Sequence, residues 1–458
     1  MPSVNPQIFR EYDIRGIVDE DLNSDTIDII GRAYGTYLRR RGLRGVVLGR
    51  DNRLSSEGYR DVMARALLAT GCDVIDIGLV VTPVFYFARA KHGVQGGVMI
   101  TGSHNPPEFN GFKLGIGVAT MYGEQIQEVR SIAESGVFEK GAGSLRGFDP
   151  VSDYIEAIAG RISLGPRAVT AVVDCGNGAG GLFGPRILER IGCRVIQLFC
   201  EPDGTFPNHF PDPVKPQNLE QLAEVVRDSC ADVGVAFDGD ADRLGAVDEL
   251  GRPIWGDTLM ALFWREILPK YPGADALVEV KCSQALVDEI RRLGGKPVFS
   301  KTGHSLIKAK MREIGAVFTG EMSGHMFFAD EYYGYDDAIY ASARLARIIS
   351  RSKKPLSAMV SEIPAYHSTP ETRVECPDDI KFAIVREITA HFRSKYDVVD
   401  VDGARVLFPG GWGLVRASNT QPALVLRAEA SDPATLESIK TEISDKLAEY
   451  GPIGELTW

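Results

Sequence analysis

Residues 168–180 read AVTAVVDCGNGAG, an apolar run that is typical of a buried strand and that ends in a glycine-rich loop. A helix pattern follows, with Ile187, Leu188 and Ile191 on one face. A second apolar run, CRVIQLF, occupies residues 193–199. Continuous apolar strands that alternate with amphipathic helices are typical of a parallel sheet covered on both faces.

The same order of elements occurs before and after this stretch. Each copy continues through another helix into a third strand. The predicted strands of the first copy are GVVLGRD (45–51), CDVIDIG (72–78) and GGVMI (96–100); the second copy ends with DVGVAF (232–237); the third has ALVEVKC (276–282), KPVFS (296–300) and GAVFT (315–319). The repeat predicts three related α/β domains with mixed or parallel sheets.

The chain reads differently from about residue 365. A helix pattern is followed by the strand runs VVDV (398–401) and ARVLF (404–408), which flank Asp402-Gly403, a strong hairpin signal. Two more strand runs and a last helix complete a smaller α+β domain. The predicted domains are residues 1–150, 151–252, 253–364 and 365–458.

A loop of unusual composition follows the third strand of each repeat. These loops are TGSHNP (101–106), DGDADR (238–243) and GEMSGH (320–325). In open α/β sheets, ligands bind outside the carboxyl ends of the strands. The three loops are therefore the candidate functional segments.

The loop DGDADR predicts a cation site. On an extended segment, alternate side chains share a face, so Asp238, Asp240 and Asp242 would point the same way. Three hard oxygen ligands suit Mg²⁺, and Arg243 beside them could grip a phosphate. A calcium loop is the rival, but Arg243 stands where its turn needs glycine and the flank is strand-like. A solvated acidic turn is the plain alternative.

The loop TGSHNP places Ser103 in a tight turn after a buried strand. Serine, asparagine and proline are also ordinary turn residues. The loop is not a nucleophile elbow, and an adjacent Ser-His pair makes poor geometry for a triad. A serine that carries a phosphoryl group beside a metal loop explains both motifs.

Two further polar segments read as binding loops. GEMSGH offers Glu321, Ser323 and His325 at alternate positions, which suits sugar hydroxyls and proton transfer, although a structural histidine is the plain alternative. RASNTQP (416–422) offers a guanidinium, hydroxyls and backbone N–H groups for a phosphate, although Ser-Asn-Thr is also a common turn.

Composition restricts the class of protein. The net charge of −11 argues against a general nucleic-acid binder. The N-terminus has no apolar signal-peptide core, and no run of 18 apolar residues predicts a membrane span. Seven cysteines, odd in number and without a CxxC pair, predict reduced thiols, a cytoplasmic location and no zinc site.

These motifs, in this order, resemble the α-D-phosphohexomutase family and, more closely, its phosphomannomutase/phosphoglucomutase branch. The resemblance covers essentially the whole chain and rests on FREYDIRG (9–16), TGSHNPPEFNGFK (101–113), DGDADR, TGHSLIK (302–308), GEMSGH and RASNTQP. It implies three related α/β domains and a smaller C-terminal domain around a central cleft.

The resemblance also implies a mechanism. A phosphorylated Ser103 would give its phosphoryl group to a mannose or glucose phosphate, form a hexose 1,6-bisphosphate and take back the other phosphoryl group. Glucose 1,6-bisphosphate, or its mannose counterpart, would activate the enzyme. Mg²⁺ would be held by Ser103, Asp238, Asp240 and Asp242.

The remaining implied roles are catalytic and substrate-binding. The implied catalytic set is Ser103, His104, Lys113, Arg15 and His325. The implied substrate contacts are Tyr12, Arg243, Lys281, His304, Glu321, Ser323, His325, Arg416, Ser418, Asn419, Thr420 and Arg427. The substrates are small hexose phosphates, with neither nucleic acid nor membrane as partner; the sequence indicates no oligomeric state.

Three alternatives remain. A phosphomonoesterase could use the same serine and metal, but it needs only one phosphate grip and no exclusion of water. A phosphoglucosamine mutase is the second, and Met322 and Asn419 depart from the pattern of that branch. The third is a non-catalytic calcium- or sugar-binding protein.

Overall fold

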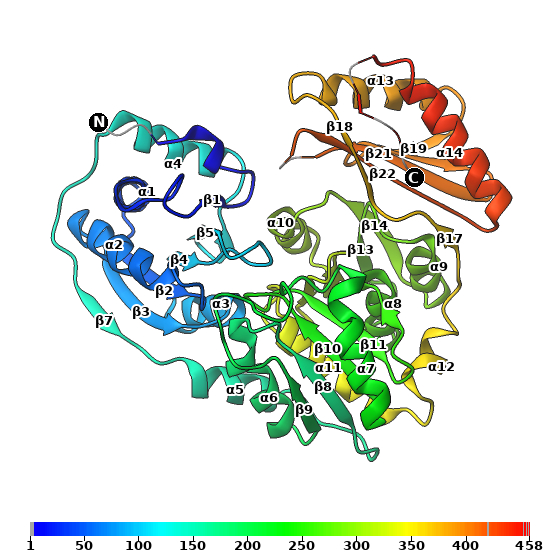
Figure 1. Cartoon of the computed structure of the whole chain (residues 1–458), viewed down its shortest axis with the longest axis horizontal. Coiled ribbons are helices and arrows are strands. Elements are labelled where there is room, and N and C mark those ends of the chain that lie inside the picture. Colours follow the sequence, from blue (N-terminus) through cyan, green and yellow to red (C-terminus); the bar gives the residue numbers. More distant parts are fainter. Residues whose placement is uncertain (1–3, 419–420, 452, 455, 457) are drawn as a thin grey trace. The chain divides into compact units, whose positions relative to one another are not determined.

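Strands and helices alternate along most of the chain, as the apolar periodicity predicts (Figure 1). The computed structural model describes residues 4–418, 421–451, 453–454, 456 and 458. They fall into two compact units. The first unit holds the residues up to Gly256 together with Ser323–Met359, and the second holds Asp257–Met322 and the residues from Val360 onward.

The first sheet is mixed. Its strands are β1 (Ile14–Ile17), β2 (Gly45–Arg50), β3 (Asp73–Leu79), β4 (Gly96–Ile100), β5 (Phe109–Ile116), β6 (Ala119–Thr120) and β7 (Leu145–Gly147). Their order is β1-β5-β4-β2-β3-β7, and β6 pairs with β5. β2 runs parallel to β3 and β4, whereas β5 runs antiparallel to β1 and β4. This arrangement brings β1 and the carboxyl end of β4 to either side of β5.

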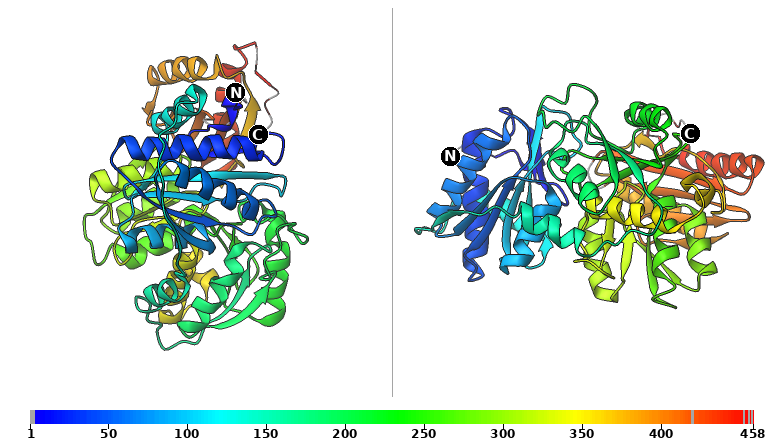
Figure 2. Two further views of the ribbon diagram at one scale, coloured as in Figure 1. Left: turned by 90° about the vertical axis from the view of Figure 1, so that its left-hand side faces the viewer. Right: turned by 90° about the horizontal axis from the view of Figure 1, so that it is seen from below.

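Helices cover both faces of the first sheet (Figure 2). They are α1 (Ser24–Arg40), α2 (Ser56–Ala69), α3 (Thr82–His92) and α4 (Glu124–Ser135), and a short 3-10 helix (Pro6–Ile8) precedes them. Val46 and Val98 point into the core that α1 and α2 share. Gly97 faces α3, where a Cβ would lie 2.6 Å from Arg89. The absence of a side chain at Gly97 lets α3 pack closely on β4.

The second sheet has three parallel strands and an antiparallel edge. Its strands are β8 (Thr170–Asp174), β9 (Arg194–Leu198), β10 (Val233–Phe237), β11 (Leu244–Asp248) and β12 (Pro253–Ile254), in the order β12-β11-β10-β8-β9. The surrounding elements are α5 (Val151–Ala159), α6 (Gly184–Arg190), α7 (Glu220–Ser229), α11 (Ala338–Arg351), β16 (Met326–Phe328), α12 (Leu356–Val360) and two 3-10 helices (Ala179–Leu182 and Pro216–Leu219). Val172, Leu222, Val226 and Val247 form the core between this sheet and α7.

The third repeat contributes a parallel strand pair to the second unit. Its elements are α8 (Gly256–Ile267), β13 (Asp275–Glu279), α9 (Gln284–Arg292), β14 (Lys296–Ser300), α10 (His304–Ile314) and β15 (Phe318–Gly320). β13 pairs with β14 in parallel. The predicted strands at 276–282 and 296–300 therefore form, and the first of them ends at Glu279.

The C-terminal domain is an antiparallel sheet under two helices. Its elements are β17 (His367–Ser368), β18 (Thr372–Glu375), α13 (Lys381–Arg393), β19 (Asp397–Val399), β20 (Ala404–Phe408), β21 (Gly411–Ala417), β22 (Ala423–Ala430) and α14 (Pro433–Leu447). α13 and α14 share one apolar core with the sheet. The predicted hairpin is confirmed: β19 and β20 pair antiparallel, and Gly403 turns the chain with φ +86°.

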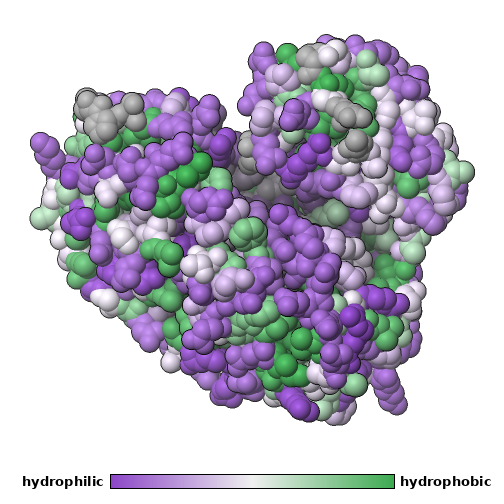
Figure 3. Space-filling model, in the orientation of Figure 1, coloured by the Kyte–Doolittle hydropathy of each residue, from purple (hydrophilic) through white to green (hydrophobic). Residues whose placement is uncertain are grey.

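The predicted fold class of three related α/β domains and a C-terminal α+β domain is confirmed. Polar side chains cover most of the face in Figure 3, in keeping with the charged composition. Within the described part of the chain, no helix has the length and apolar character needed to cross a bilayer.

Candidate active site

Three carboxylates converge directly after β10. One carboxylate oxygen each from Asp238, Asp240 and Asp242 lies within 4.8 Å of the others, and all three side chains are buried. The expected extended segment is wrong, because residues 238–242 form a tight turn. Ala241 adopts φ +55°, and Asp238 Oδ1 accepts hydrogen bonds from the backbone N–H groups of Asp242 and Arg243. This turn, and not strand alternation, brings the carboxylates together. We call residues 238–242 the acidic turn.

Ser103 lies against this turn. Its Oγ donates a hydrogen bond of 2.9 Å to Asp238 Oδ2, and the residue is buried in the left-handed conformation with φ +50°. His104 Nδ1 lies 3.1 Å from the same Oγ, so the adjacent histidine reaches the hydroxyl. Burial lowers the pKa of His104 well below its usual value. The serine therefore has a carboxylate and an imidazole at hydrogen-bond distance.

Lys113, on β5, supplies positive charge to the acidic turn. Its Nζ lies 2.8 Å from Asp240 Oδ2 and also contacts Asp242 Oδ2. Burial alone would lower the pKa of Lys113, but the two carboxylates hold it well above its usual value. Burial opposes ionisation of Asp242 too, but Lys113 and His325 keep its pKa well below the usual range. Burial and the two neighbouring carboxylates raise the pKa of Asp238 well above its ordinary value.

The donor set fits a hard divalent cation. Carboxylate oxygens and a hydroxyl are the ligand types that Mg²⁺ takes in proteins. Among the described residues, Asp240 Oδ1 is buried without a hydrogen-bond donor. A buried carboxylate oxygen without a partner is costly unless a cation binds it. Asp238, Asp240, Asp242 and Ser103 are therefore the residues that would hold the ion.

Four more of the expected residues lie in the first unit. His325 Nε2 lies 3.2 Å from Asp242 Oδ1, and Ser323 Oγ lies 3.1 Å from His325 Nδ1. Arg243 Nε lies 3.5 Å from His325 Nε2. Arg15, on β1, donates to Asn105 Oδ1 at 2.7 Å. It therefore contacts residues 101–106, which we call the serine loop. A fifth, Tyr12, is half-buried in the turn before β1.

A second cluster of expected residues lies in the second unit. Arg416 Nε contacts Asp402 Oδ2 at 3.0 Å, and Lys281 Nζ contacts Glu371 Oε2 at 2.9 Å. Arg427 donates to the backbone carbonyl of Lys281 at 2.6 Å. Burial alone would raise the pKa of Glu371, but Lys281 lowers it to about 2. We call Lys281, Arg416 and Arg427 the cationic cluster.

Loops of the third and fourth domains border the cationic cluster. Glu321 is buried, and its Oε1 accepts a hydrogen bond of 2.8 Å from the N–H of Gly303. His304 begins α10 directly after that glycine. Ser418 is buried at the end of β21, where its Oγ accepts from Gln421 N–H at 3.2 Å. Asn419 and Thr420 lie outside the described residues.

Family models match all four domains. They are the phosphoglucomutase/phosphomannomutase alpha/beta/alpha domains I (residues 6–140), II (152–251) and III (255–366) and the C-terminal domain (371–446). The chain belongs to the phosphoglucomutase/phosphomannomutase family. The resemblance stated from the motifs is thereby confirmed, and the chain is a phosphohexomutase, an isomerase of carbohydrate metabolism.

Relatives match the phosphohexomutase over its full length. A phosphomannomutase/phosphoglucomutase of Pseudomonas aeruginosa is 44% identical over 97% of this chain and 96% of its own. A phosphoglucomutase of Neisseria gonorrhoeae is 42% identical over 96% of both chains. A crystal structure of a phosphoglucomutase/phosphomannomutase family protein from Burkholderia thailandensis superimposes with a TM-score of 0.93 at 41% identity, covering 100% of both chains.

Two buried residues contact the loops of the candidate active site but belong to no recognisable sequence motif. Arg53 donates to the backbone carbonyls of Ser103 at 2.8 Å and Asn105 at 2.5 Å, and its guanidinium forms an ion pair with Asp51 at 3.2 Å. Thr82, the first residue of α3, donates through Oγ1 to Asp240 Oδ2. An arginine after GRD and a threonine before proline are unremarkable in sequence. Only their contacts mark them.

Glycines lie where the serine loop, the acidic turn and the loop after β8 approach each other. A Cβ on Gly239 would lie 2.4 Å from the carbonyl oxygen of Ser103, and one on Gly178 would lie 3.0 Å from Gly239 Cα. A Cβ on Gly102 would lie 2.5 Å from the Arg53 guanidinium. Glycine therefore sets the distance between the serine loop and the acidic turn.

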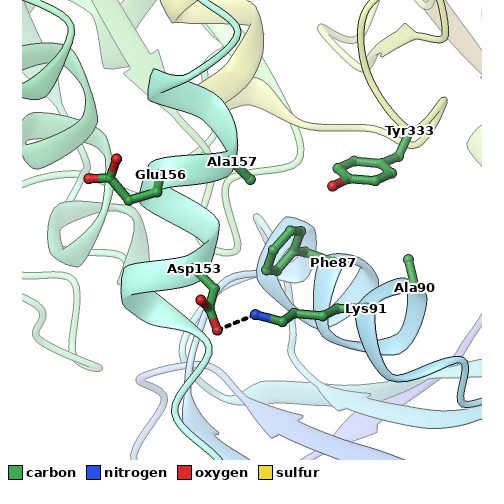
Figure 4. Close-up of a pocket in the computed structure, with 7 residues that line it drawn as sticks. All are labelled: Phe87, Ala90, Lys91, Asp153, Glu156, Ala157 and Tyr333. Carbon is green, nitrogen blue, oxygen red and sulfur yellow. Dashed lines mark ion pairs between the residues drawn. The ribbon is translucent and has the colours of Figure 1, made fainter.

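A pocket of about 520 Å³ lies elsewhere in the first unit (Figure 4). It is lined by Phe87, Ala90 and Lys91 of α3, by Asp153, Glu156 and Ala157 of α5, and by Tyr333. Lys91 and Asp153 form an ion pair across it. None of the motif residues lines this pocket, so it is distinct from the candidate active site.

Proposed function

We propose that the chain interconverts the 1- and 6-phosphates of mannose and glucose by way of a phosphoryl group carried on Ser103. The contact that carries the proposal is the 2.9 Å hydrogen bond between Ser103 Oγ and Asp238. This hydrogen bond joins Ser103, in the loop after β4, to the carboxylates that follow β10. Family membership and the names of the full-length relatives support the choice of sugars.

In the proposed reaction, phospho-Ser103 meets a hexose monophosphate. The P–Oγ bond of the serine breaks while a free sugar hydroxyl forms a new bond to the same phosphorus. The hydroxyl proton leaves to a base, and Ser103 Oγ regains a proton. The product is a hexose 1,6-bisphosphate, whose other phosphoryl group then returns to Ser103 after the sugar turns over.

Different groups around Ser103 neutralise charge and transfer protons in the proposed reaction. Mg²⁺, when bound by the three aspartates, would neutralise charge on the transferring phosphoryl group. The ammonium of Lys113 balances the carboxylates from within β5, and Arg243 presents a guanidinium beside them. His104 Nδ1, 3.1 Å from Ser103 Oγ, is placed to hold the proton of the serine, and His325 is placed to serve the sugar hydroxyl.

The cationic cluster is proposed to bind the phosphate that does not react. A hexose 1,6-bisphosphate has two phosphates, and each needs its own grip. Arg416, Lys281 and Arg427 provide fixed donors suited to phosphate oxygens, whereas Glu321 suits sugar hydroxyls. A hydrolase would need only the serine and the cation, so the second cluster favours a mutase over a phosphomonoesterase.

Phosphorus NMR tests the proposal. Purified protein is given Mg²⁺, a trace of glucose 1,6-bisphosphate, and glucose 1-phosphate or mannose 1-phosphate. We expect the 6-phosphate to form without inorganic phosphate, and the two rates rank the sugars. Accumulating inorganic phosphate would instead show a phosphatase, and turnover of glucosamine 1-phosphate alone would show the amino-sugar activity.

A serine variant locates the chemistry. Ser103→Ala removes the carrier oxygen, so we expect no turnover and no phosphoryl transfer from glucose 1,6-bisphosphate to the protein. Ser342→Ala is the matched control, because Ser342 is also buried in the first unit but donates only to the Ile339 carbonyl of its own helix. Normal turnover by Ser103→Ala would remove the proposed mechanism.

A further inference from the structure

Two buried cysteines lie side by side next to the acidic turn. Cys175 follows β8 directly, and Cys200 follows the parallel neighbour β9 by one residue (Figure 1). Their Sγ atoms are 3.3 Å apart. A disulfide bond is about 2.05 Å long, so the sulfurs need to approach by about 1.2 Å to form one. The proposed function gives neither thiol a role.

The loops that carry the two cysteines are fixed to each other. The N–H of Cys175 donates to the carbonyl of Leu198 at 3.2 Å, and the N–H of Asn177 donates to that of Phe199 at 2.8 Å. Phe199 has φ +49°, a conformation that is rare for a bulky residue and that persists only where the surroundings enforce it. Backbone hydrogen bonds therefore fix the two loops to each other, and this keeps the two cysteines next to each other.

We propose that Cys175 and Cys200 form a reversible disulfide when the protein meets a small hydroperoxide, and that this bond weakens cation binding at the acidic turn. Cys200 keeps 9% of its surface exposed, whereas Cys175 has none. Burial also raises the pKa of Cys175 well above its usual value. Cys200 is therefore the thiol that the oxidant reaches first.

The chemistry proceeds in two balanced steps. The sulfur of Cys200 attacks the peroxide, the O–O bond breaks, and a sulfenic acid forms with release of water or alcohol. The sulfur of Cys175 then attacks the sulfenic sulfur, the S–O bond breaks, and the hydroxyl leaves as water with the proton of Cys175. The two cysteines lose two electrons in total, and the peroxide gains them. A small dithiol reverses the oxidation by thiol–disulfide exchange.

The disulfide would act on the acidic turn through a short backbone path. The N–H of Gly178 donates to the Cys175 carbonyl at 2.7 Å, and the N–H of Ala179 donates to the Gly239 carbonyl at 3.2 Å. Gly178 and Gly239 pack without room for a Cβ. A displacement of Cys175 therefore shifts Gly239, which stands between Asp238 and Asp240. This second part of the proposal rests on the proposed function.

Titration with hydrogen peroxide tests both parts. Reduced protein is treated, digested without reductant and mapped by mass spectrometry. We expect a cross-linked peptide pair containing Cys175 and Cys200 and the loss of two free thiols. We also expect the Mg²⁺ concentration for half-maximal mutase activity to rise severalfold and to return after treatment with dithiothreitol. Cys193→Ser, which removes another buried thiol of the same domain, should respond as the wild type does.

The outcomes separate the two parts. Cys175→Ser and Cys200→Ser should each lose the cross-link and the response of the Mg²⁺ dependence. Oxidation of other thiols without a 175–200 cross-link would overturn the disulfide, and this measurement needs only the wild-type protein. A cross-link with an unchanged Mg²⁺ dependence would overturn the coupling. A protein that forms the cross-link but has no mutase activity would contradict the proposed function and leave the disulfide established.

Discussion

Thr82 Oγ1 donates a hydrogen bond of 2.5 Å to Oδ2 of Asp240, a residue 158 positions later in the chain. The N–H of Thr82 also donates to the backbone carbonyl of Asp240 at 3.0 Å. One residue at the start of α3 thus holds both the side chain and the backbone at the centre of the acidic turn. A ligand carboxylate that is already oriented loses less freedom when a cation binds.

Thr82→Val removes the hydroxyl and nearly keeps the shape of the side chain. Because groups that orient metal ligands typically contribute tenfold to a hundredfold in affinity, we expect Mg²⁺ to bind about tenfold more weakly. Isothermal titration calorimetry with Mg²⁺ measures this directly. Thr70→Val is the control, since Thr70 is equally buried but donates to the Leu67 carbonyl within the first domain. Equal Mg²⁺ affinities in all three proteins would contradict the role of Thr82.

Lys113→Met leaves buried carboxylates without their ammonium partner. Removing one member of a buried ion pair typically costs about 3–5 kcal/mol, so the variant should unfold at a markedly lower temperature in the presence of a chelator. Mg²⁺ should then raise the midpoint more than it does in the wild type, because the cation supplies the missing charge. Thermal unfolding with EDTA and with Mg²⁺ measures both effects.

The half-exposed pair of Lys91 and Asp153 provides the control for Lys113. Its side chains are 39% and 44% exposed, so Lys91→Met should change the midpoint little under either condition. An identical Mg²⁺ effect on Lys113→Met and the wild type would mean that the ammonium does not balance the proposed metal ligands.

Asp337 gives stability a pH dependence. Burial raises its pKa to about 7, although Tyr332 and Tyr154 donate hydrogen bonds to it. A folded pKa above the unfolded value of about 3.9 means that the stabilising contribution is complete below that value and is lost as pH rises to about 7. The difference corresponds to at most about 4 kcal/mol.

Asp337→Asn does not titrate, so its stability relative to the wild type should rise between pH 5 and pH 8. Thermal unfolding of both proteins across this range measures the change. Ser342→Ala, in the same helix α11, should keep a constant difference from the wild type. A pH-independent difference for Asp337→Asn would show that the carboxyl group ionises at an ordinary pH.

Arg416→Ala removes one proposed phosphate donor. Charge-assisted hydrogen bonds contribute about 1.5–3 kcal/mol, so glucose 6-phosphate should bind about tenfold to a hundredfold more weakly while free glucose is little affected. Calorimetric titration with the two ligands measures the contrast. Arg393→Ala, on an exposed arginine of the same domain, should change neither affinity. Equal losses for both ligands would assign Arg416 a structural role.

The strands and the positions of the four candidate loops could be predicted from sequence because their signals are local. Apolar runs, glycine stops and the Asp402-Gly403 hairpin each determine the backbone within a few residues. The four-domain division at residues 150, 252 and 364, the roles of the motif residues and the cytoplasmic location stay predictions. Local signals identify where the loops lie but not how their side chains meet.

The contacts that complete the site are not local. Alternating aspartates look the same on a strand and in a turn, and nothing in the identity of Ala241 indicates its left-handed backbone. Arg53 and Thr82 act through partners distant in sequence, and Cys175 and Cys200 are 25 positions apart without a CxxC spacing. Packing alone brings these groups together, so no short segment of the sequence indicates their contacts.

The close approach of Gly178 and Gly239 ties two loops of one domain together, the loop after β8 and the acidic turn after β10. A side chain gained at either position would push the acidic turn away from the Ser103 carbonyl or from the loop after β8. A mutation in one loop could then survive only if a compensating change arose in the other loop, more than fifty residues further along the chain. We therefore expect Gly178 and Gly239 to be replaced together or not at all. Their joint presence can then help to recognise distant relatives that keep this arrangement of loops.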